Sequence, residues 1–70
     1  MKSIYYVYRD GDKIYRVARI DNGSLAYGYE GGKWVYMPSL IKIQNEITDY
    51  EEISEDEANK LIEELNTYDN

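Results

Sequence analysis

The side chains of this 70-residue chain that could do chemistry are mostly carboxylates, and they form two short clusters. The first, Asp10-Gly11-Asp12, has the spacing of a fragment of a calcium-binding loop, but the downstream ligands of such a loop are missing. The second runs from Glu51 to Glu57, with no apolar pocket around it that would prepare a carboxyl group for acid–base catalysis. We therefore expect neither cluster to hold a metal ion or to act as a catalytic pair.

Other catalytic systems are also missing. The chain contains no His and no Cys, so neither a Ser–His nor a Cys–His nucleophile can be assembled. The stretch from Gly28 to Lys33 is superficially similar to a phosphate-binding loop. However, Tyr27 stands where that motif needs its first Gly, and Trp34 replaces the magnesium-binding Ser or Thr. We expect a protein that is not an enzyme, with no catalytic residue, no metal site and no cofactor.

Charge is sorted along the chain. Residues 1–42 carry 7 Lys/Arg and 4 Asp/Glu, a balance of +3, whereas residues 43–70 carry 1 Lys and 10 Asp/Glu, a balance of −9. Such asymmetry favours a partner selected by electrostatics. The leading hypothesis is a non-catalytic protein-binding module or inhibitor that docks on a basic partner, such as a nucleic-acid-handling complex. Its acidic surface would comprise Asp49, Glu51, Glu52, Glu55, Asp56, Glu63 and Glu64.

Aromatic residues suggest two alternatives. The chain has nine Tyr, one Trp and no Phe, and tyrosine suits half-exposed sheets and interfaces. An aromatic interface on the sheet could stack on the bases of single-stranded nucleic acid, its candidates being Tyr6, Tyr8, Tyr15 and Trp34. The net charge of −6 opposes that function, and Arg16 and Arg19 are expected on opposite faces of one strand. The other alternative is a small homodimeric structural protein that buries a Tyr-rich face.

The first 37 residues predict a meander of antiparallel strands separated by Gly-containing turns, over Ser3–Arg9, Lys13–Ile20, Leu25–Glu30 and Lys33–Met37. A two-residue type I′ turn at Asp10-Gly11 would place Tyr8 opposite Lys13, whereas a three-residue loop with a bulge would shift that register. Strand one is apolar on both faces, so one helix could cover only one of them and the other would stay exposed. Gly28 indicates a bend, a bulge or a close backbone approach.

The C-terminal helix has the clearest signals. Ser54-Glu55-Asp56-Glu57 is a capping box, and an apolar face follows at Ala58, Leu61, Ile62 and Leu65. Residues 39–47 fit either a short helix capped by Ser39 or a strand, and residues 48–52 read as a polar connector.

The predicted fold is a single α+β domain over residues 1–70: an antiparallel β-meander of about four strands, with a C-terminal amphipathic helix packed on one face. Its parts are a meander (1–37), an apolar segment and acidic linker (38–52), a capped helix (53–66) and a tail (67–70). No stretch has the length of a membrane span or a signal peptide, so we expect a cytoplasmic protein. The expected core comprises Val7, Ile14, Ala18, Ile20, Leu40, Ile43, Leu61, Ile62 and Leu65, with Trp34 or Val35.

Two resemblances accompany this prediction. The hairpin, Trp34-Val35, the acidic linker and then Ile53-Ser54-Glu55-Asp56-Glu57-Ala58 are similar to a pattern in short uncharacterised bacterial and phage proteins, which implies the α+β fold. In size, acidity and lack of catalytic residues the chain also resembles small phage anti-defence proteins, including anti-CRISPR proteins. That resemblance implies an inhibitor that binds a protein partner.

Overall fold

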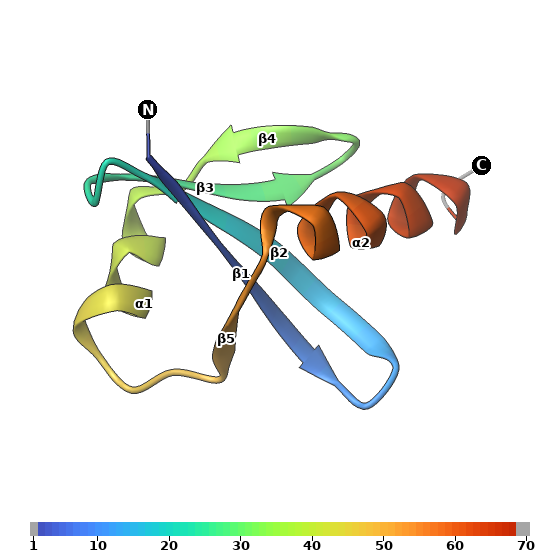
Figure 1. Cartoon of the computed structure of the whole chain (residues 1–70), viewed down its shortest axis with the longest axis horizontal. Helices are drawn as coiled ribbons and strands as arrows, with labels where there is room; N and C mark the ends of the chain where they lie inside the picture. The colour runs from blue at the N-terminus through green and yellow to red at the C-terminus, as the bar shows by residue number, and fades with distance from the viewer. Residues whose placement is uncertain (1, 69–70) are drawn as a thin grey trace.

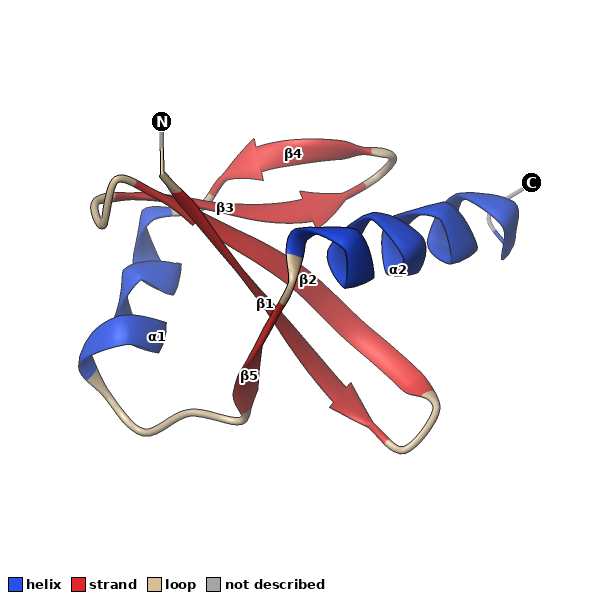
Figure 2. Ribbon diagram, in the orientation of Figure 1, coloured by secondary structure: helices blue, strands red, loops and turns tan. Residues whose placement is uncertain are grey.

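A five-stranded antiparallel sheet with helical segments on both faces makes up the part of the chain that the structure describes, residues 2–68 of a computed structural model (Figure 2). The strands lie in the order β4-β3-β2-β1-β5. The predicted α+β fold, a meander followed by a C-terminal helix, is confirmed. The elements are β1 (Ser3–Asp10), β2 (Lys13–Asp21), β3 (Leu25–Glu30), β4 (Lys33–Tyr36), the 3₁₀ helix η1 (Pro38–Ile41), α1 (Lys42–Asn45), β5 (Tyr50–Ile53) and α2 (Glu55–Tyr68).

Strand β5 is the element that the sequence did not predict. The polar connector expected at residues 48–52 is in part a strand that pairs antiparallel with β1, with Tyr8 opposite Tyr50 and Val7 opposite Glu51. Glutamate is uncommon in strands, but β5 lies at the edge of the sheet, where charged residues are tolerated and discourage pairing with another chain. Its presence makes β1 an interior strand, with β2 on one edge and β5 on the other. Both faces of β1 are apolar because helical segments pack on each of them.

The turn between β1 and β2 lies one residue later than predicted. Asp10 pairs with Lys13, so the loop residues are Gly11 and Asp12. Gly11 has a φ of 59° and Asp12 is not among the residues with positive φ, which is typical of a type II′ turn. The predicted type I′ turn and its pairing of Tyr8 with Lys13 are therefore wrong.

A bulge at Tyr15 then determines which side chains share a face. The register shifts between Tyr8 and Arg9, so Tyr8 lies opposite Arg16. Without the extra residue, Ile14 and Val17 would point to opposite faces because side chains alternate along a strand. With it, both pack on the α2 side of the sheet. The bulge thus supplies one face with two apolar side chains.

Both faces of the sheet are covered. On one face, Ala58 and Leu61 of α2 pack against Val7 and Val17. On the other face, η1 and α1 supply Leu40 and Ile43, which pack against a cluster completed by Tyr6, Ala18, Ile20 and Ala26. Figure 1 shows the α1 segment and α2 at opposite ends of the molecule. The expectation of an exposed second face is wrong, because the segment after Pro38 folds back over it as a short helix.

The predicted core is mostly correct. Val7, Ala18, Ile20, Leu40, Ile43 and Leu61 are buried. Ile14, Trp34, Ile62 and Leu65 are partly buried and pack against the α2-side cluster. The buried residues that were not predicted are Tyr6, Val17, Ala26, Gly28, Ala58 and Asp21.

Helix α2 begins as its sequence indicates. The hydroxyl of Ser54 accepts a hydrogen bond from the backbone N–H of Glu57 at 3.1 Å, which confirms the N-cap. The carboxylate of Glu57, expected to reach back to Ser54, lies 3.8 Å from Arg9 instead. The helix continues to Tyr68, two residues past the predicted end, and the last two residues of the predicted tail lie outside the described residues. At η1, Pro38 occupies the first turn and Ser39 provides no cap.

Gly28 allows η1 to approach the sheet. It pairs with Ala18 in regular register, so it marks no bulge. A Cβ atom there would lie 2.7 Å from Sδ of Met37 and 3.3 Å from Cδ1 of Leu40. We expect Gly28→Val to lower the free energy of unfolding by about 1–2 kcal/mol, since a well-packed core resists extra volume. Urea denaturation checks this, with Glu30→Val on the same strand as an exposed control. Equal stability of the two variants would contradict it.

Candidate functional site

The predicted acidic residues are exposed but lie in two places. Glu55, Asp56, Glu63 and Glu64 are on the solvent side of α2 and are called here the acidic helix face. Glu51 and Glu52 are neighbours on β5 and so point to opposite faces of the sheet, and Asp49 lies just before that strand. The structure therefore joins four of the seven predicted residues into one surface and separates the other three.

Arg9 partly neutralises the negative charge that β5 carries. Its Nη2 atom lies 2.6 Å from Oε1 of Glu51 and 3.8 Å from Oε2 of Glu57. These contacts connect β1, β5 and the first turn of α2. Because all three side chains are substantially exposed, the ion pairs contribute at most about 1 kcal/mol each to stability. Glu51 is consequently less available to a partner than the carboxylates of the acidic helix face.

The two ends of the acidic helix face differ in their effect on α2. Glu55 and Asp56 lie in the first turn, where carboxylates interact favourably with the helix dipole. The Tyr5 hydroxyl also donates to Glu55 at 3.4 Å. Glu63 and Glu64 lie past the middle of the helix but before its last turn, so the helix dipole has little effect on them. Within residues 2–68, neither has a cation within 4 Å.

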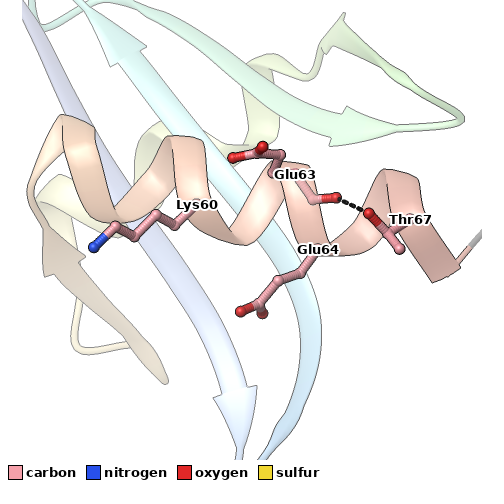
Figure 3. A pocket seen from close by; sticks show the side chains of 4 residues that line it. All are labelled: Lys60, Glu63, Glu64 and Thr67. Atoms are coloured by element: carbon pink, nitrogen blue, oxygen red, sulfur yellow. Dashed lines mark hydrogen bonds between the residues drawn. The ribbon is translucent and has the colours of Figure 1, made fainter.

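The surroundings of Glu63 and Glu64 are shallow. Figure 3 shows both beside Lys60 and Thr67, with the Thr67 hydroxyl donating to the Glu63 carbonyl at 2.9 Å. On the other side of Glu64, the residue Asp12 from the β1–β2 turn lines a second hollow with it. Asp12 therefore extends the acidic helix face. Sequence reasoning missed it because only the fold brings the turn to this end of α2.

The four residues predicted as an aromatic interface do not share a surface. Tyr6 is buried. Tyr8 and Tyr15 lie together on the η1 side, with ring centroids 4.9 Å apart. Trp34 lies on the α2 side, where it contacts Tyr5 and Tyr29.

Arg16 and Arg19 also lie on opposite faces of the sheet. Arg19 lies against the rings of Tyr27 and Trp34, at 4.5 Å and 4.7 Å, and its Nε is 3.0 Å from Asp21. Arg16 lines a hollow on the opposite face with Leu40 and Tyr50. The predicted separation of Arg16 from Arg19 is confirmed, so these two arginines cannot bind one phosphate backbone together.

A groove lies on the η1 side of the sheet. Its first hollow, about 420 Å³, is lined by Tyr8, Tyr15, Arg16, Ser39, Leu40, Lys42 and Tyr50. A second hollow of about 320 Å³ shares Tyr8, Lys42 and Tyr50 and continues to Ile47. We call the two together the tyrosine groove. Sequence reasoning did not find it, because Tyr50 joins Tyr8 only through the unpredicted pairing of β5 with β1.

Among residues 2–68, no three carboxylates come close enough together to hold a metal ion. No helix in that range has the length and apolar character needed to cross a bilayer. No protein-family model, curated protein or solved structure matches this chain. The case for a function therefore rests on the two surfaces described above, the acidic helix face and the tyrosine groove.

Proposed function

We propose that this protein is a non-catalytic binding module whose acidic helix face docks on a basic surface of a protein partner. The observation that carries the proposal is the position of Glu63 and Glu64. Both are exposed and adjacent in sequence, and neither has a cation within 4 Å in residues 2–68. Exposed carboxylates that are not paired within the described residues are available to a basic partner.

The charge density of this face suggests the class of partner. From Glu55 to Glu64 the helix rises about 14 Å, at about 1.5 Å per residue, and carries the four carboxylates of the acidic helix face together with Lys60. One strand of duplex DNA carries a phosphate about every 3.4 Å, which gives a similar number over that length. A basic groove that binds nucleic acid therefore fits as the docking surface. By occupying such a groove the module would act as an inhibitor, in the manner of an anti-defence protein.

The test compares two double charge reversals with the same change in net charge. Glu63→Lys/Glu64→Lys alters the acidic helix face, whereas Asp10→Lys/Glu52→Lys alters exposed residues outside both that face and the tyrosine groove. Affinity capture from lysate of the source cells, followed by mass spectrometry, identifies the partner and measures its yield. We expect the first variant to lose at least about ten-fold in capture and the second to retain it. Raising the salt should weaken wild-type capture, because exposed charges are screened.

The stability of Glu63→Lys/Glu64→Lys shows whether a loss of capture comes from lost recognition or from a disturbed fold. Both positions are exposed and precede the last turn of α2, so Glu63→Lys/Glu64→Lys should change the free energy of unfolding by less than about 1 kcal/mol. Urea denaturation measures this. A larger loss of stability would show that the two glutamates serve the fold. Two outcomes would contradict the proposal: an equal yield of the partner with both double variants, or a yield with the wild type that does not change with salt concentration.

A further inference from the structure

The tyrosine groove differs from the acidic helix face in its charge. Arg16 and Lys42 line its first hollow, and Glu46 and Asp49 lie at its far end. Its floor combines side chains from β1, β2 and β5, and its wall comes from η1 and α1. Tyr8 is central, with ring centroids 4.9 Å from Tyr15 and 5.4 Å from Tyr50. Aromatic side chains of this kind supply rigid contact area at binding surfaces.

Two cations line the groove in a chain whose net charge is −6. The nearest carboxylate to Arg16 is Glu30, whose oxygen is 3.8 Å from the guanidinium, too far for a hydrogen bond. Within residues 2–68, Lys42 has no carboxylate within 4 Å. Burial raises the pKa of Tyr50. Its hydroxyl is protonated at neutral pH, as in any tyrosine, and can donate a hydrogen bond. The groove thus offers positive charge and donors beside aromatic rings.

The far end of the groove indicates what occupies it. The side chain of Ile47 is fully exposed at the end of the second hollow, next to Glu46 and Asp49. A nucleotide would leave Ile47 uncovered, and further phosphates of a strand would meet the two carboxylates. An extended peptide could place an acidic side chain near the cations and still reach Ile47 with an apolar one.

We propose that the tyrosine groove binds a short extended segment of a protein partner, with an acidic side chain between Arg16 and Lys42 and a proline or aromatic side chain on Tyr8 and Tyr50. A following apolar side chain packs on Ile47. The inference shares with the proposed function only the premise that the partner is a protein. It concerns a separate surface with the opposite charge preference.

The test is an NMR titration of the ¹⁵N-labelled full chain with three probes: the end-blocked peptide Asp-Pro-Tyr-Ser-Leu, its counterpart Lys-Pro-Tyr-Ser-Leu, and adenosine monophosphate. We expect the acidic peptide to give saturable shifts at the amides of Arg16, Leu40, Lys42 and Tyr50. Arg16→Gln/Lys42→Gln should weaken its affinity about ten-fold, since each exposed charge contact contributes a factor of a few. Glu63→Lys/Glu64→Lys should leave it unchanged, which keeps this test independent of the acidic helix face.

A second variant tests the inference with a substitution that should not affect folding. Ile47→Asp changes a fully exposed side chain, so the fold should be intact, and we expect the acidic peptide to bind several-fold more weakly. Absence of localised shifts with the acidic peptide would overturn the inference. Equal affinity for the basic peptide, or binding of adenosine monophosphate alone, would overturn it as well.

Discussion

Ile20→Ala is expected to lower the free energy of unfolding by about 2–4 kcal/mol, because it leaves a cavity in the core on the η1 side. Ile20 is 1% exposed and belongs to the cluster that Leu40 and Ile43 complete from above the sheet. A domain of this size rarely has more than about 3–5 kcal/mol of stability. The variant should therefore retain only about 1 kcal/mol of stability, with a measurable unfolded fraction at 25 °C.

Circular dichroism and urea denaturation measure this loss. Ile20→Val provides a graded control, with an expected decrease of about 0.5–1.5 kcal/mol. Ile47→Ala provides an exposed control, with an expected change within about 0.5 kcal/mol. If Ile20→Ala were as stable as Ile47→Ala, the segment from Pro38 to Asn45 would not cover the sheet as described.

Local signals were sufficient for most elements of this fold. The turns after Asp10, Ile20 and Glu30 contain Gly residues with positive φ, and Ser54 caps its helix as expected. Such features depend on neighbouring residues only, so the sequence shows them directly. Strand β5 depends instead on its pairing with β1, which is distant in the sequence. Tyr-Glu-Glu-Ile has weak strand character and pairs because β1 presents a free edge 40 or more residues away in sequence.

The two candidate surfaces differ in the same way: one depends on neighbouring residues and the other on residues that are distant in the sequence. The acidic helix face lies on one helix, so the pattern of Glu and Asp in residues 55–64 was enough to predict it. The tyrosine groove is built from β1, β2, η1, α1 and β5, and no local pattern indicates that these elements meet. The bulge at Tyr15 also had to be known, because it decides that Arg16 shares a face with Tyr8.

Asp21 is the clearest case of a residue whose role the sequence concealed. As part of Asp21-Asn22-Gly23 it reads as a turn residue, yet it is 3% exposed. Its Oδ1 accepts a hydrogen bond from the Ser3 hydroxyl at 2.6 Å and lies 3.0 Å from Nε of Arg19. That nitrogen is buried and not aligned for a hydrogen bond, so Asp21 supplies its compensating charge.

We therefore expect Asp21→Ala to lower the free energy of unfolding by about 2–3 kcal/mol. Removing one partner of a fully buried ion pair costs about 3–5 kcal/mol, and the partial exposure of the Arg19 side chain, 20%, reduces that value. Asp21→Asn should lower the free energy of unfolding by less, because its amide oxygen can still accept a hydrogen bond from the Ser3 hydroxyl. Urea denaturation measures both variants.

A double-mutant cycle with Arg19→Met isolates the ion pair. If Asp21 compensates the charge of Arg19, the double variant should be more stable than the sum of the single losses predicts, since no uncompensated guanidinium remains. Asp49→Ala, at an exposed carboxylate in the loop before β5, should change stability by less than about 0.5 kcal/mol. Additive losses in the cycle, or a loss in Asp21→Ala no larger than in Asp49→Ala, would show that the Asp21 carboxylate does not stabilise this end of the sheet.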